Sequence, residues 1–204
     1  MATLPHRHNV RLLAGLAAAV FFGGLAVSTV HAAPAPAATL DGRTTVVTSA
    51  AVTSALVTNE IAPLAVDPGW ESFTDTGKVR LGFPITGGML QGLSGDIRHH
   101  GGINFVDFKT GKSLLISSFD VVLDAHPHLT AYVPALNAKG VTIFDLDLSK
   151  ARITTTKDGT TVSNVIVTLD AGAAAALNSA LGTGSLFAGG MTIGTASVRL
   201  TADH

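Results

Sequence analysis

Short segments in which apolar and polar residues alternate recur from about residue 78 onward, and they constrain the fold more than any other feature. Alternation with a period of two is typical of strands that are buried on one face. Turn residues separate the segments at intervals of roughly 8–12 residues, as in antiparallel β-sandwiches and barrels. The clearest segments are KVRLGFPIT (78–86), LLISSFDVVLD (114–124), VTIFDLDL (141–148) and VSNVIVTL (162–169). We therefore predict a mainly β fold, an antiparallel β-sandwich.

Local signals refine this pattern. Asp158-Gly159 lies between two β segments and predicts a tight hairpin. Pro84 lies inside a strand, where its missing N–H predicts an edge strand or a bulge. One short α-helix is predicted near residues 170–181, because Asp170 can cap its start, four consecutive Ala favour it, and Gly182 can end it.

The first 32 residues have the pattern of a secretory signal peptide. Residues 1–11 carry two Arg and no acid, residues 12–30 are uncharged and mostly apolar, and Val30 and Ala32 are the small residues that precede a cleavage site. The alternative is a retained anchor, since the apolar run is long enough to span a bilayer. We expect cleavage after Ala32, no membrane span thereafter, and a protein that is secreted, extracellular or associated with the cell wall.

Composition divides the remaining chain. Residues 33–66 are rich in Pro, Ala and Thr, hold no period for long, and are expected to be a lead-in that is strand, helix or partly disordered. Residues 67–204 are expected to form one β domain. The chain has no Cys, so neither disulfides nor thiolate sites are available. Its formal net charge is −1 without a basic cluster, which argues against nucleic acid as a partner.

Four of the eight histidines lie in two short clusters, His99-His100 and His126-Pro127-His128. Neutral imidazole is a good ligand for zinc, copper or haem iron. Neighbouring residues of a strand point to opposite faces, so His99 and His100 cannot share a pocket unless Gly101-Gly102 breaks the strand. The alternative, which we favour, is that these histidines lie in solvated turns.

Asp145 and Asp147 share one face of a predicted strand, and with Asp120 or Asp124 they could bind calcium or form a catalytic pair. Acids that alternate with Phe and Leu are also typical of the solvent face of a half-buried sheet, and we favour this second interpretation. No G-x-S-x-G motif and no phosphate loop is present in the sequence. We therefore predict no catalytic residue, no metal site and no enzymatic activity.

Seven segments occur in a characteristic order and spacing between about residues 67 and 200. They are GWESF (69–73), FPITGG (83–88), LSGDIRHHGGINF (93–105), LLISSFDVVLD (114–124), LTAYV (129–133), IFDLDLSKA (143–151) and VIVTLDAGAAAALN (165–178). In this the chain resembles the HtaA domain family of exported and surface proteins of actinobacteria. The resemblance implies a mainly antiparallel β fold with one or two short helices, and haem binding and transfer at the cell surface.

The resemblance also indicates which residues to compare with the family's haem site. The family uses a Tyr as iron ligand, near the segment after its Trp-Ser-Phe piece, with a His supporting it. Here the stretch after Phe73 reads TDTGKV, and the only Tyr of the chain is Tyr132. The family's His before Gly corresponds to His99-His100-Gly101, with His100 nearest in register. The candidate haem-binding residues are therefore His100, His99 as its alternative, and Tyr132.

Two functions follow from these observations. The first is an exported, non-enzymatic binding protein of the HtaA type, with haem as the candidate ligand and haem or a cell-surface protein as the partner. The second is a structural or protein-interaction module of the cell envelope without a cofactor.

Overall fold

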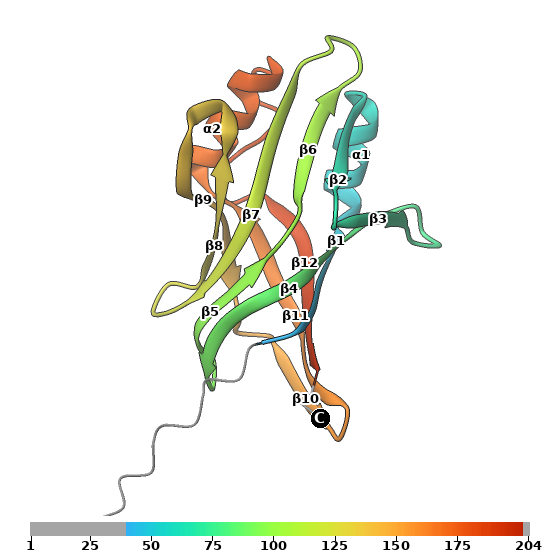
Figure 1. Cartoon of the computed structure of the whole chain (residues 1–204). Coiled ribbons are helices and arrows are strands. Elements are labelled where there is room, and N and C mark those ends of the chain that lie inside the picture. The colour runs from blue at the N-terminus through green and yellow to red at the C-terminus, as the bar shows by residue number, and fades with distance from the viewer. Residues whose placement is uncertain (1–39, 202–204) are drawn as a thin grey trace, which may run out of the picture. The chain divides into compact units, whose positions relative to one another are not determined.

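A computed structural model describes residues 40–201, and the signal peptide predicted for residues 1–32 lies outside them. Within residues 40–201 the chain forms strands, two α-helices and one short 3-10 helix (Figure 1). The strands are β1 (Gly42–Thr48), β2 (Ile61–Val66), β3 (Trp70–Phe73), β4 (Val79–Gln91), β5 (Ser94–His99), β6 (Gly102–Asp107), β7 (Ser113–Leu123), β8 (His128–Val133), β9 (Ala138–Asp147), β10 (Arg152–Thr156), β11 (Gly159–Leu169) and β12 (Thr192–Thr201). The helices are α1 (Ala50–Thr58), α2 (Ala171–Leu181) and the 3-10 helix η1 (Pro134–Leu136). No helix within this described range is long and apolar enough to cross a membrane.

Eight of the strands close into an antiparallel barrel. Hydrogen bonds join them in the order β7-β5-β4-β1-β12-β11-β9-β8, and β8 pairs back with β7. The mainly antiparallel β class is confirmed. The expected sandwich is instead a barrel, because the pairing of β8 with β7 closes one sheet on itself, whereas a sandwich has two separate sheets with free edges. Strands β6 and β2 extend from β7, β10 pairs with β11, and β3 pairs with β4.

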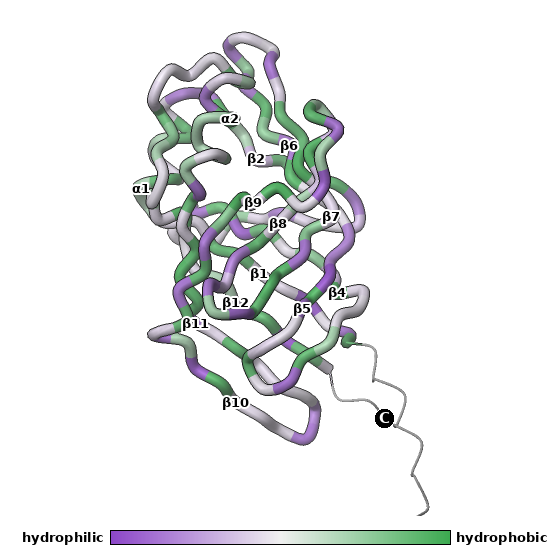
Figure 2. The backbone as a smooth tube through the Cα atoms, turned by 90° about the vertical axis from the view of Figure 1, so that its left-hand side faces the viewer, coloured by the Kyte–Doolittle hydropathy of each residue, from purple (hydrophilic) through white to green (hydrophobic). Residues whose placement is uncertain are grey.

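Alternating side chains place the apolar residues inside the barrel. On β7, Phe119, Val121 and Leu123 are buried, whereas Asp120 and Val122 between them point outward. Figure 2 shows this alternation of hydrophobic and hydrophilic residues along the barrel strands. The periodicity in the sequence therefore predicted correctly which residues of the second half of β7 are buried. In the first half the phase differs, because an irregularity at Ser118 shifts it: Leu114 and Ile116 are buried, and Leu115, which the alternation places with Phe119, is not.

The Asp158-Gly159 pair and Pro84 form local structures that the sequence predicted. The hairpin at Asp158-Gly159 joins β10 to β11. Pro84 lies within β4, which is flanked by β1 and β5, and a bulge follows it between Ile85 and Gly87, so the bulge is the correct alternative.

Helix α2 forms where the sequence predicts it. The Asp170 carboxylate accepts a hydrogen bond from the N–H of Ala173 at 3.0 Å. Gly182 ends the helix in the left-handed conformation, which glycine adopts without strain. Leu177 and Leu181 are buried and fix the helix over one end of the barrel.

Much of the expected lead-in belongs to the barrel. Strand β1 lies between β4 and β12, helix α1 follows it, and β2 pairs with β6. The Ser49 side chain caps α1 by accepting a hydrogen bond from the N–H of Val52 at 3.2 Å. The lead-in therefore contributes a central strand of the barrel from Gly42 onward.

The segment His99-His100-Gly101-Gly102 is a kink between two strands. Both β5 and β6 pair with the same side of β7, and the chain bends between them. Opposite the bend, the N–H of Ser118 donates to the carbonyl of Gly101 at 3.0 Å. Gly101 has φ +95°, and a Cβ there would lie 2.8 Å from the Val66 carbonyl oxygen, so the bend requires glycine.

Candidate ligand-binding lumen

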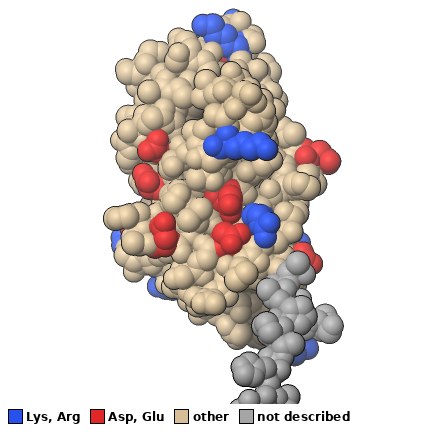
Figure 3. All heavy atoms as spheres, turned by 60° about the vertical axis from the view of Figure 1, so that its left-hand side comes forward, with Lys and Arg blue, Asp and Glu red and all other residues tan. Residues whose placement is uncertain are grey.

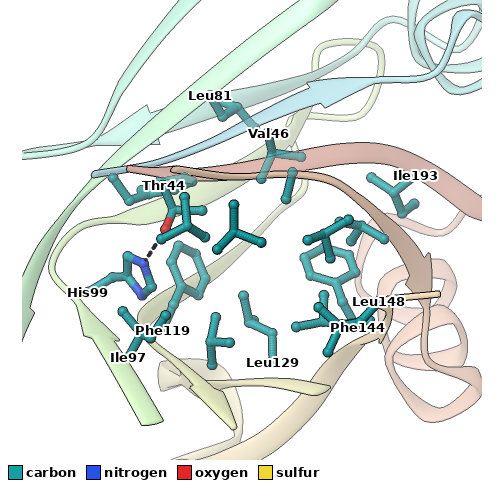
Figure 4. Close-up of a pocket in the computed structure, with 18 of the residues that line it drawn as sticks. Thr44, Val46, Leu81, Ile97, His99, Phe119, Leu129, Phe144, Leu148 and Ile193 are labelled. Carbon is teal, nitrogen blue, oxygen red and sulfur yellow. Dashed lines mark hydrogen bonds between the residues drawn. The ribbon is translucent and has the colours of Figure 1, made fainter. Parts of the chain in front are cut away.

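Side chains do not fill the interior of the barrel. The buried apolar residues form two clusters, a large one that includes residues of both helices and a small one further along the barrel. The small cluster consists of Ile85, Ile97, Val121 and Leu123. A cavity of about 330 Å³, here called the lumen, is lined by members of both clusters (Figure 4).

Several inward-facing residues show that the lumen is a real gap in the packing. Leu129, Leu146 and Leu148 pack against both clusters and line the lumen, yet they are only partly buried. In a filled core, such inward-facing leucines would be fully buried. Their remaining exposed surface therefore faces the lumen.

The lining is almost entirely apolar. Among residues 40–201, the only polar side chains that line the lumen are Thr44, Thr48, Thr160 and His99, and none of the lining residues is Asp, Glu, Lys or Arg. Cavities of this character exclude water and bind apolar molecules.

The two ends of the lumen differ. At one end it is closed by buried residues of the helices and of the loop after α2, among them Leu56, Leu177 and Phe187. At the other end its lining includes Leu93 of the β4–β5 turn and Ile153 of β10, which are 45% and 53% exposed. The lumen therefore opens to solvent between these two hairpins, here called the mouth.

Of the lining residues between 40 and 201, His99 alone carries an ionisable group. It lies two residues after the inward-facing Ile97 on β5 and is 4% exposed. A hydrogen bond of 2.6 Å joins its Nε2 to the Thr44 hydroxyl on the neighbouring wall (Figure 4). Its Nδ1 is buried without a hydrogen-bond partner.

The environment keeps the His99 ring neutral. Burial lowers its pKa from 6.5 to about 4, and the backbone carbonyls of Phe119 and Ile97 offset this only in part. Neither carbonyl has hydrogen-bond geometry with Nδ1. At neutral pH the lumen therefore presents an uncharged imidazole.

The structure does not bring the three candidate haem-binding residues together. His100 is exposed on the opposite side of the strand from His99, as strand geometry predicts. Tyr132 lies on the outer face of β8, where its hydroxyl donates to Asn137 at 3.5 Å. Trp70 packs on Gly82 outside the lumen. Only His99 reaches the lumen. Thr44, its partner, was not among the candidates, because the sequence around it has no clear period.

The carboxylates considered for metal binding or catalysis lie on the outer surface. Asp145 and Asp147 are exposed on β9, as expected for a solvent face. Asp120 lies beside Arg98 in register, and its pKa is raised by burial and by repulsion from Asp96. Figure 3 shows acidic side chains gathered on this side of the barrel. Among residues 40–201, no three His, Asp or Glu side chains are placed to hold a metal ion.

The fold is similar to that of solved structures. The C-terminal domain of HtaA from Corynebacterium glutamicum superposes with a TM-score of 0.55, covering 80% of this chain and 99% of that domain, at 13% identity. The chain has the HtaA fold. A domain-swapped dimer variant of the same domain matches with a TM-score of 0.49 over 76% of this chain and 92% of the other, at 14% identity. No family model matches the sequence, and no curated protein matches it.

The HtaA fold agrees with the family resemblance seen in the motifs. At 13% identity the likeness extends to the fold and does not transfer individual site residues. The function of this chain must therefore be argued from its own lumen.

Proposed function

We propose that this protein is a non-enzymatic binding protein that carries an apolar ligand in the lumen of its HtaA-fold barrel. The observation that supports this most is the lumen itself, which has about 330 Å³, an apolar lining and one open end. Ligand pockets typically have about 300–1,000 Å³ and an apolar lining with a few polar groups. Eight-stranded barrels are also of the size that encloses one small ligand.

Haem is the ligand that the family resemblance implies, but the described residues do not fit it. Haem iron is held by a side chain such as His or Tyr, and of the three candidates only His99 lines the lumen. The Nε2 of His99 is bonded to Thr44, so only its Nδ1 would be left for iron. Among the described residues that line the lumen there is also neither Lys nor Arg for the two propionate groups of haem. We therefore propose a ligand other than haem.

We further propose that the protein acts outside the cytoplasm, secreted or associated with the cell wall. This rests on the signal-peptide pattern of residues 1–32. N-terminal sequencing of the protein recovered from culture medium or cell wall should give a chain that starts at Ala33. A chain that keeps residues 1–32 would contradict cleavage.

Titration of the purified protein with two probes tests the proposed ligand site. The apolar dye 1-N-phenylnaphthylamine should gain fluorescence and saturate at one molecule per chain, because it transfers from water into the lumen. Haemin should keep the absorption spectrum of free haemin. A shifted Soret band that is lost in His99→Leu or His100→Ala would assign haem to this protein and overturn the proposed ligand class.

A pair of variants on one strand supplies the control. Val198 lines the lumen, whereas Thr195 is exposed on the outer face of the same strand. Val198→Phe should weaken dye binding and Thr195→Phe should leave it unchanged. Equal binding by both variants would place the dye elsewhere. Without any saturable dye binding, the proposal fails and the interaction module of the cell envelope becomes the better hypothesis.

A further inference from the structure

The lumen is long and narrow. Along β11 its lining runs from Thr160 to Leu169 through every second residue, except for one extra residue at the bulge between Val162 and Val165. Without the extra residue of the bulge, this stretch advances by about eight steps of roughly 3.3 Å, which at a tilt of about 40° to the barrel axis correspond to a length of roughly 20 Å. A volume of about 330 Å³ spread over this length is a channel rather than a wide pocket.

The lumen has a distinct inner end and outer end. The inner end is sealed by side chains that are at most 6% exposed, among them Leu56, Leu177 and Phe187. The outer end is the mouth, where Leu93 and Ile153 meet solvent. A ligand that enters at the mouth therefore leaves one of its ends deep in the apolar interior and the other near water.

The residues that line the lumen make it unfavourable for a charged group to lie inside it. The buried cluster closest to the mouth, Ile85, Ile97, Val121 and Leu123, is wholly aliphatic. Within the part of the chain that the structure describes, no charged side chain lines the lumen. An ionised group placed there would lose its hydration without gaining a partner, at a large free-energy cost. A charged head group must therefore remain at the mouth.

We propose that the lumen binds the single unbranched alkyl chain of an amphiphile, with its methyl end toward the helices and its polar head at the mouth. This inference rests on the proposed function, since it names the ligand class of the same site. An extended chain advances about 1.3 Å per carbon, from a C–C bond of about 1.5 Å. A channel of roughly 20 Å thus takes about 16 carbons.

Displacement of cis-parinaric acid, a linear fluorescent chain, tests the length. Saturated fatty acids of 8, 12 and 16 carbons are titrated against it. Each added methylene should tighten binding by up to about fourfold, from ~0.8 kcal/mol per buried CH₂, with no further gain beyond about 16 carbons. Vesicles of a two-chain phospholipid should not displace the probe. Affinity that is independent of chain length, or displacement by the vesicles, would overturn the proposal.

Opposite charges at the mouth test the orientation of the bound chain. Ile153 is 53% exposed at the mouth, and Val57 is 70% exposed on α1, outside the lumen lining. Ile153→Glu should bind the fatty acid two- to fivefold more weakly than Ile153→Lys, because the carboxylate head lies beside position 153. Val57→Glu and Val57→Lys should bind equally. Equal binding by the two Ile153 variants would contradict a head group at the mouth.

The outcomes separate this inference from the proposed function. If 1-N-phenylnaphthylamine binds and cis-parinaric acid does not, the lumen binds apolar ligands but the alkyl chain is wrong. If neither probe binds, the proposed function fails as well.

Discussion

Lowering the pH from 7 to 4.5 should destabilise the protein through one side chain, His99. The folded protein holds the pKa of His99 at about 4, whereas an unfolded chain has 6.5. The folded state binds the proton less tightly than the unfolded chain. His99 therefore does not lower the free energy of unfolding at pH values above 6.5, and it lowers this free energy as the pH falls from 6.5 toward 4. At pH 4.5 the loss from this group is about 2.5 kcal/mol, with a limit of about 3.4 kcal/mol below pH 4.

Urea unfolding followed by the fluorescence of Trp70 measures this loss. The double variant Thr44→Val with His99→Leu replaces both partners of the buried hydrogen bond by apolar groups, which is close to neutral at pH 7. Carboxylates also titrate over this range, but they are common to both proteins and cancel in the comparison. The wild type should therefore lose about 2–3 kcal/mol more than the double variant between pH 7 and pH 4.5.

The neighbouring histidine is a matched control. His100 is exposed, so His100→Leu should keep the pH dependence of the wild type. The reasoning is refuted if the double variant loses as much stability as the wild type, or if His100→Leu removes the difference.

Four further substitutions have distinct expected outcomes. Val198→Phe extends into the lumen and should raise the free energy of unfolding by about 1 kcal/mol. Ala174→Phe, in the packed interface under α2, should lower it by about 1–3 kcal/mol. Chemical denaturation shows whether each substitution raises or lowers this free energy. Gly101→Ala should cost about 1–3 kcal/mol, because it combines a positive φ with a clash against a backbone carbonyl, and a loss below 0.5 kcal/mol in the same assay would contradict this. Gly82→Ala would place a Cβ within the ring of Trp70, so the emission of this single Trp should shift to the red as the ring moves into water; an unchanged spectrum would contradict the packing.

Strands with a clear period were predictable, and the closure of the barrel was not. The alternation on β9 and on the second half of β7 identifies the inward residues, but the same alternation suits a sandwich and a barrel alike. The difference lies in one long-range pairing, between β7 and β8, that periodicity does not encode. Strand β1 was only one of the alternatives for its segment, because GRTTVVT carries Thr on both faces, including the buried Thr44 and Thr48.

The site was predictable in part. Strand geometry correctly separated His99 from His100, and the inward phase of Ile97, two residues earlier, would have identified His99 as the buried member. The family resemblance favoured His100 instead. The lumen itself could not be predicted, because it depends on how completely inward side chains fill a closed barrel.

Xenon binding tests the central claim, an empty apolar lumen inside the barrel, most directly. Xenon occupies dry apolar cavities without requiring any particular ligand chemistry. A crystal pressurised with xenon should show xenon between the two apolar clusters, in contact with Leu129 and Leu146. A barrel without xenon, in which these leucines are fully packed by neighbouring side chains, would contradict the lumen and the binding function built on it.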